Sequence, residues 1–182
     1  MEEYRPRLVQ VPIAQIRPTE YLINHDGFYS INCLFAKELK FKPIRGYYNG
    51  REFFPEDGNK RSLFLHEKGD ETISARVYEM DWEFEDVEEL AERARMFGVT
   101  KISDLSRRKL PGKEYGLVDE MCSKIRTSRD LDYFCDAFGI SCFDEFICKV
   151  KMDNKSEIIK TCRRLFGVDS YSEAAERLVF GR

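Results

Sequence analysis

The stretch DGNKR, residues 57–61, is the part of this chain that says most about its fold. It joins a short apolar run at residues 51–54 to a run of helical character at residues 62–68, which predicts a strand, a glycine turn and a helix. The free N–H groups of a helix start favour an anion, and Lys60 and Arg61 add two cationic donors there. The stretch therefore predicts a phosphate-binding corner, although the same residues also fit an ordinary turn followed by a solvated helix end.

The residues before this corner predict a β-hairpin. Residues 45–53 are rich in β-prone side chains, and Asn49-Gly50 interrupts them. An Asn-Gly pair between two such runs is typical of a two-residue hairpin turn. We therefore expect two antiparallel strands directly ahead of the corner.

Residues 8–80 resemble the N-terminal domain of the ParB/sulfiredoxin superfamily, and four landmarks carry the resemblance. Residues 11–20 are similar to the opening strand and I-x-P turn of the family, and residues 42–44 to the P-I entry of the next strand. Residues 57–61 resemble the D-G-H-H-R or G-E-R-R signature, and residues 72–77 the strand that comes after the signature helix. The four landmarks occur in the order and spacing of the family.

Three positions depart from the family pattern. Asn59 stands where sulfiredoxins carry the reactive cysteine, so reduction of a sulfinic acid is not expected. Phe64 replaces the small alanine that usually closes the signature in partition proteins, and Lys60 occupies a position that is often histidine.

The resemblance implies a nucleotide, which could be ATP, ADP or CTP. By analogy, Gly58 would allow close approach, and Asn59, Lys60 and Arg61 would hold the phosphates. Members of the superfamily use the nucleotide in different ways: sulfiredoxins phosphorylate a sulfinic acid, archaeal serine kinases phosphorylate a hydroxyl, and partition proteins use CTP to switch a DNA clamp. Phosphoryl transfer and nucleotide hydrolysis are thus both expected possibilities.

Two carboxylates are the catalytic candidates. Glu20 matches a glutamate of the kinase branch, two residues after the proline of the first turn, and could accept the proton of a substrate hydroxyl. Asp57 could help to coordinate a Mg²⁺ ion together with substrate phosphates. The alternatives are a surface role for Glu20 and a turn or N-cap role for Asp57.

Composition narrows the class of protein. Of 182 residues, 42% are hydrophobic and 35% charged, which is typical of a globular chain. The net charge of −3 argues against a broad non-specific DNA surface. The sequence shows no export signal and no apolar run long enough to span a membrane. We therefore expect a cytoplasmic protein with reduced thiols and no membrane partner. The six cysteines include no C-x-x-C pair, so no metal site is expected.

The organisation of the chain changes near residue 81. Helical periodicity begins at residues 87–97, and Phe-Gly pairs at residues 97–98, 138–139 and 166–167 each fit a helix that ends in a glycine C-cap. We therefore predict an α+β protein: a small mixed-sheet ParB/sulfiredoxin-like domain at residues 1–81, and an α-helical domain at residues 82–182.

The helical half offers an alternative function. A helix expected at residues 100–109 carries four cations that could meet DNA phosphates: Lys101, Arg107, Arg108 and Lys109. Asp104 stands where a helix-turn-helix motif needs a buried aliphatic residue, which favours a plain αα-hairpin. The amphipathic segment 156–182 favours packing or homo-oligomer formation.

The function predicted first is nucleotide binding, with a possible phosphotransferase or nucleotidase activity. The alternative is a DNA-binding, partition-like or regulatory protein that reads DNA through its helical half. A non-catalytic interaction module is a third hypothesis.

Overall fold

The computed structural model describes residues 6–36, 41–78 and 82–152, together with the single positions 164, 173 and 177. The third Phe-Gly corner, at residues 166–167, lies outside the described residues. The same holds for the amphipathic segment 156–182 apart from those three positions, so its packing or oligomer role stays a prediction.

The described chain alternates strands and helices up to residue 78 and is mainly helical after residue 82. In order, the elements are β1 (Arg7–Pro12), η1 (Ile13–Gln15), β2 (Ile23–Asn24), α1 (His25–Ala36), β3 (Ile44–Tyr48), β4 (Phe53–Asp57), α2 (Asn59–Lys68), β5 (Thr72–Tyr78), α3 (Trp82–Met96), η2 (Ile102–Arg108), β6 (Lys109–Leu110), α4 (Gly112–Cys122), α5 (Ser128–Phe138) and α6 (Phe143–Met152), where η marks a 3-10 helix.

Four strands form a mixed sheet in the order β1-β5-β3-β4. β5 runs antiparallel to β1 and parallel to β3, while β3 and β4 form an antiparallel hairpin. A second, two-stranded sheet pairs β2 with β6. The predicted α+β class with a mixed sheet is confirmed.

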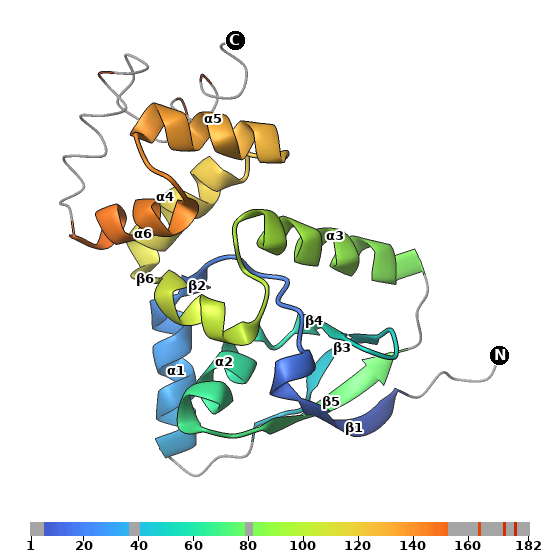
Figure 1. Ribbon diagram of the computed structural model, residues 1–182. Coiled ribbons are helices and arrows are strands. Elements are labelled where there is room, and N and C mark those ends of the chain that lie inside the picture. The colour runs from blue at the N-terminus through green and yellow to red at the C-terminus, as the bar shows by residue number, and fades with distance from the viewer. Residues whose placement is uncertain are drawn as a thin grey trace.

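Helices cover both faces of the sheet (Figure 1). In β5, Ile73, Ala75 and Val77 alternate onto one face, where they share a core with α1, α2 and η2. On the other face, α3 packs against the hairpin, so that Phe54 and Val87 belong to one buried cluster. Because successive side chains of a strand point to opposite faces, the sheet contributes to a buried cluster on each side.

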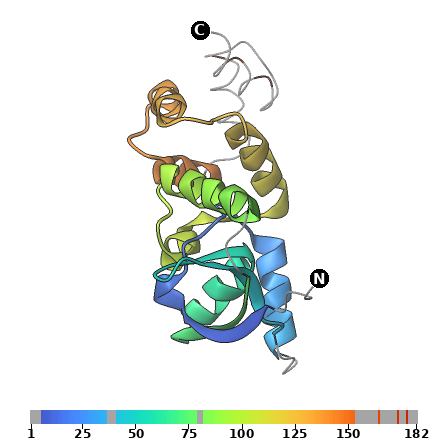
Figure 2. The same cartoon turned by 90° about the vertical axis from the view of Figure 1, so that its right-hand side faces the viewer.

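The main core crosses residue 81, where the sequence predicts a domain boundary. Ala94, Val99, Ile102 and Leu105 come from the second part of the chain, yet they are fully or almost fully buried in the core formed by the first part. A separate core lies among α4, α5 and α6, which are grouped at the end of the molecule away from β1 (Figure 2). The elements α3 and η2 therefore complete the N-terminal unit.

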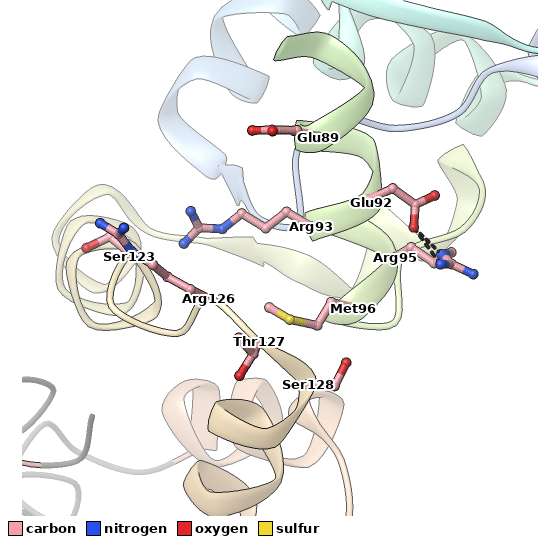
Figure 3. Close-up of a pocket in the computed structure, with 9 residues that line it drawn as sticks. All are labelled: Glu89, Glu92, Arg93, Arg95, Met96, Ser123, Arg126, Thr127 and Ser128. Atoms are coloured by element: carbon pink, nitrogen blue, oxygen red, sulfur yellow. Dashed lines mark hydrogen bonds and ion pairs between the residues drawn. The ribbon is translucent and has the colours of Figure 1, made fainter. Parts of the chain in front are cut away.

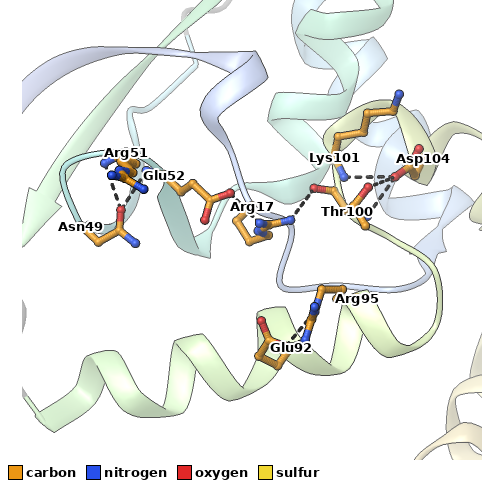
Figure 4. A network of polar contacts seen from close by, with 9 residues as sticks. All are labelled: Arg17, Asn49, Arg51, Glu52, Glu92, Arg95, Thr100, Lys101 and Asp104. Carbon is orange, nitrogen blue, oxygen red and sulfur yellow. Dashed lines mark hydrogen bonds and ion pairs between the residues drawn. The ribbon is translucent and has the colours of Figure 1, made fainter. Parts of the chain in front are cut away.

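A polar network also links the two parts (Figure 4). The guanidinium of Arg17 lies 2.6 Å from a carboxylate oxygen of Glu52 in the hairpin loop. It also donates to the carbonyl of Thr100, after α3, at 3.2 Å. One side chain thus connects the first turn, the hairpin and the segment between α3 and η2.

The hairpin is confirmed, but its loop is longer than predicted. Tyr48 pairs with Phe53, so residues 49–52 form a four-residue loop. The Asn49 side chain explains this, because its oxygen accepts the N–H groups of Arg51 and Glu52 at 3.0 and 2.9 Å. The expected glycine C-caps at Gly98 and Gly139 are confirmed by their positive φ values of 84° and 61°.

Candidate functional site

The candidate corner is a strand end, a single glycine and a helix start. β4 ends at Asp57, Gly58 is the N-cap residue of α2 with φ 135°, and the helix begins at Asn59. A Cβ atom on residue 58 would lie 2.3 Å from Cγ2 of Ile44. Glycine is required here both by the backbone conformation and by the close approach to β3. Within the described part of the chain, no side chain caps the first turn of α2.

Asn59 points into the protein and holds the turn that carries Glu20. Its side chain is buried, accepts the N–H of Thr19 at 3.2 Å and donates to the Thr19 hydroxyl at 2.8 Å. The same hydroxyl donates to the carbonyl of Pro55 at 2.8 Å. Both ends of the amide are therefore occupied, and its effect on the site is to position residues 19 and 20.

Lys60 and Glu20 face one another beside the helix start. The ammonium of Lys60 lies 3.4 Å from both carboxylate oxygens of Glu20. Burial raises the pKa of Glu20 above its ordinary value; Lys60 opposes this shift, and Asp57 and Asp119 add to it. A carboxylate with a raised pKa next to a cation can exchange a proton more readily than an exposed glutamate.

Arg61 points away from Lys60 and binds other parts of the corner. It forms an ion pair of 2.6 Å with Asp57, one turn earlier in the chain. Its guanidinium also donates to the carbonyl of Lys42 and, at 3.2 Å, to that of Pro43. Arg61 thus fixes the entry of β3 against the start of α2, and both of its terminal nitrogens donate to groups of the corner.

A pocket of about 920 Å³ opens beside Asp57 and Arg61. One part of its lining is cationic, formed by Lys42, Arg45, Arg61 and Arg76, with Asp57 as the one carboxylate. The other part is apolar, formed by Ile31, Leu34, Phe41 and Pro43. The lining therefore combines a positive excess with an apolar wall.

Two of these cations are neighbours across the sheet. Arg45 and Arg76 are paired in register on β3 and β5. Arg45 has a long contact of 3.7 Å with the exposed carboxylate of Glu56, while Arg76 forms no ion pair with any residue that the structure describes. Like charges side by side are unfavourable unless an anion lies between them.

Sequence reasoning missed two residues behind Glu20, namely Tyr115 and Asp119 of α4. Burial raises the pKa of Tyr115 to about 12, with further contributions from Asp119 and Glu20. Asp119 also accepts the hydroxyl of Tyr21 at 2.8 Å. Nothing in the sequence near Glu20 indicates these partners, because they lie almost a hundred residues away.

The four cations expected to meet DNA are separated by the structure. They lie on the 3-10 helix η2 and its ends rather than on one α-helix. Arg108 is buried, binds Asp144 at 2.6 Å and donates to the carbonyl of Phe97 at 2.6 Å. Lys109 pairs with Glu67 at 2.6 Å, which leaves Lys101 and Arg107 as the two exposed members.

No protein-family model matches the chain, and no curated protein matches its sequence. Among the described residues, no helix combines the length and apolar character needed to cross a bilayer. No three histidine, cysteine or carboxylate side chains in the described ranges come together as a ligand set for a metal.

Proposed function

We propose that this protein binds a nucleotide at the corner formed by residues 57–61, with the phosphates at the start of α2. The observation that carries the proposal is the pocket beside Asp57 and Arg61, whose positive and apolar parts match the two ends of a nucleotide. The resemblance of residues 8–80 to the ParB/sulfiredoxin superfamily supports the same ligand class.

The phosphates have donors from several directions. Gly58 presents no side chain, and the N–H groups of the first turn of α2 precede the first intrahelical hydrogen bond, which Ser62 donates to Gly58. Such N–H groups favour an anion because of the partial positive charge at a helix start. Arg76 and Lys42 add cations from the pocket wall.

The base of the nucleotide fits the apolar part of the pocket. Phe41 and Pro43 provide flat apolar surfaces, and Leu34 of α1 lies on the same lining. The pocket volume of about 920 Å³ is within the usual range of small-molecule sites.

A phosphoryl transfer step is the second part of the proposal. Glu20 would accept the proton of an acceptor hydroxyl, or of water, while that oxygen bonds to the terminal phosphorus. The bond from this phosphorus to the bridging oxygen breaks, and the nucleotide leaves one phosphate shorter. Asp57 would hold Mg²⁺ together with the nucleotide phosphates, since its carboxylate is 56% exposed.

The binding experiment compares two exposed arginines. We would titrate ATP, ADP, CTP and GTP, each with and without Mg²⁺, into the wild type, Arg76→Ala and Arg51→Ala, using calorimetry and thermal unfolding. Arg76 lines the pocket, whereas the Arg51 side chain lies in the hairpin loop, and neither forms an ion pair in the described ranges. Arg61→Ala is less suitable because it also releases residues 42, 43 and 57.

We expect at least one nucleotide to stabilise the wild type by about 2.7 kcal/mol at a hundredfold excess over its dissociation constant. Loss of Arg76 should weaken binding about tenfold, while loss of Arg51 should change it less than about twofold. If no nucleotide binds, or if both variants lose affinity equally, the proposed site is wrong.

The catalytic part has its own test. Glu20→Gln keeps the size of the side chain and one oxygen that can accept from Lys60, but it removes the negative charge and cannot accept the proton. We expect nucleotide binding to persist while turnover falls by about 10²- to 10⁴-fold. Unchanged turnover in Glu20→Gln would remove Glu20 from the mechanism without affecting the binding proposal.

A further inference from the structure

A second pocket, of about 900 Å³, lies between α3 and the connection from α4 to α5 (Figure 3). It is formed by residues of the second half of the chain and shares none of its lining with the corner at residues 57–61. Its lining includes three arginines and the hydroxyls of Ser123, Thr127 and Ser128. We call it the α3–α5 cleft.

Arg93 is held at one side of the α3–α5 cleft. Its guanidinium donates to the carbonyl of Cys122 at 2.8 Å and lies 5.5 Å from the centre of the Tyr21 ring. Its Nε atom is buried and has no hydrogen-bond acceptor among the described residues. The side chain is therefore fixed in position while its positive charge has no carboxylate partner within salt-bridge distance in the described ranges.

Arg126 faces it from the other side. Figure 3 shows the Arg93 side chain extending from α3 toward the connection from α4 to α5, which carries Arg126. The guanidinium of Arg126 is exposed and forms no ion pair within the part of the chain that the structure describes. Two guanidinium groups that line one cleft and have no carboxylate partner in the described ranges favour the binding of an anion there.

The first turn of α5 borders the same space. Thr127 is the N-cap residue, and its hydroxyl oxygen accepts the N–H of Asp130 at 3.2 Å. The first intrahelical hydrogen bond runs from Leu131 to Thr127, so the N–H groups of Ser128 and Arg129 precede it. The Ser128 hydroxyl also lines the α3–α5 cleft and adds a further donor.

The carboxylates that line the α3–α5 cleft do not neutralise the positive charge of Arg93 and Arg126. Glu92 is paired with Arg95 at 2.5 Å on the surface of α3. Glu89 lines the α3–α5 cleft from the N-terminal side of Arg93, two turns before the end of α3 (Figure 3). With Glu92 and Arg95 neutralising each other, Arg93 and Arg126 outnumber Glu89.

We propose that the α3–α5 cleft binds the phosphate group of a small phosphorylated molecule. Donors reach the cleft from α3, from the α4–α5 connection and from the start of α5, which suits a tetrahedral anion with several oxygens better than a planar carboxylate. The volume leaves room for the remainder of the molecule. This inference is independent of the nucleotide proposal, since the two sites have separate linings.

The test uses inorganic phosphate as the probe and the full chain. Amide ¹H–¹⁵N spectra would be recorded during titration with phosphate, and with acetate at the same ionic strength. We expect phosphate to shift the amide signals of residues 123–129 with a dissociation constant on the order of 1 mM, and acetate to bind more weakly. Because the readout is local, binding at residues 57–61 would be recognised separately.

Two neighbouring arginines provide matched variants. Arg126 lines the α3–α5 cleft, whereas Arg129, also exposed, is on the first turn of α5 but outside the lining. We expect Arg126→Ala to weaken phosphate binding about tenfold and Arg129→Ala to change it less than about twofold. Absence of shifts at residues 123–129, equal effects of the two variants, or acetate binding as tightly as phosphate would each overturn the proposal.

Discussion

Gly58 shows how one residue decides the geometry of the candidate site. Its φ of 135° lies in a region that other residues rarely adopt, and its α-hydrogen faces Ile44 of the neighbouring strand. The chain can therefore leave β4 and enter α2 without a cap side chain, so that the first N–H groups of the helix stay open to a ligand.

We expect Gly58→Ala to lower the free energy of unfolding by about 3 kcal/mol or more, since it adds a steric clash to backbone strain. Gly50→Ala is the control: Gly50 has φ 91°, but no described residue lies within 4 Å of an added Cβ. Its cost should be about 1 kcal/mol, the strain alone. Urea denaturation of both variants measures the difference, and equal losses would contradict the role of the Ile44 contact.

Residues 59–61 also show that adjacent side chains of one motif have different tasks. Asn59 points inward to Thr19, Lys60 faces Glu20, and Arg61 binds Asp57 and the entry of β3. The sequence correctly indicates a strand, a glycine and a helix here. The sequence alone does not show which residue has which partner, because the fold brings each partner to a particular side of α2.

At the scale of elements, η2 is held in place by one buried arginine. Arg108 joins the end of η2 to the start of α6 through Asp144, and to the end of α3 through the carbonyl of Phe97. Its guanidinium also lies 4.9 Å from the centre of the Phe143 ring. Arg108, which the sequence suggests as a DNA contact, thus links three elements of the structure.

We expect Asp144→Ala to destabilise the protein by about 2–3 kcal/mol, because it leaves a buried guanidinium without its counter-charge. Glu92→Ala removes an exposed ion pair on α3 and should cost at most about 1 kcal/mol. Chemical denaturation at neutral pH and moderate salt compares the two. Equal small effects would show that the Arg108 pair adds little to the packing of α6 on η2.

At the scale of the whole molecule, the main core is built from both parts of the chain. Leu105 comes after the last strand of the four-stranded sheet, yet it is completely buried in a core that is formed mostly by side chains of the first 78 residues. The link through Arg17 to Glu52 and Thr100 connects the same regions at the surface. We therefore infer that the sheet and the segment from α3 to η2 fold as one cooperative unit.

We expect Leu105→Ala to lower the free energy of unfolding by about 2–5 kcal/mol, as for a cavity in a packed core. Leu90→Ala, at a position that is 49% exposed on α3, should change it by about 0.5 kcal/mol or less. Hydrogen exchange of the β5 amides reports the coupling, since these should exchange faster in Leu105→Ala. Unchanged β5 protection would mean that the sheet folds independently of the second half.

Local patterns in the sequence were enough to predict the elements that depend on near neighbours. The strand, glycine and helix around residues 57–61, the hairpin with Asn49 and the glycine ends of helices were all visible there, because turns, caps and periodicity act over a few residues. The mixed sheet was expected from the resemblance of residues 8–80 to the ParB/sulfiredoxin superfamily.

Which side chains meet was decided only by the tertiary structure. Lys60 and Glu20 are 40 residues apart, Arg108 and Asp144 are 36 apart, and the core that contains Leu105 is formed mostly by residues of the first half of the chain. Tertiary packing also places the core across residue 81 and puts two basic clefts on different parts of the molecule. Long-range packing fixes the rotation of each helix, and that rotation sets whether a charged residue faces solvent, a partner or a ligand.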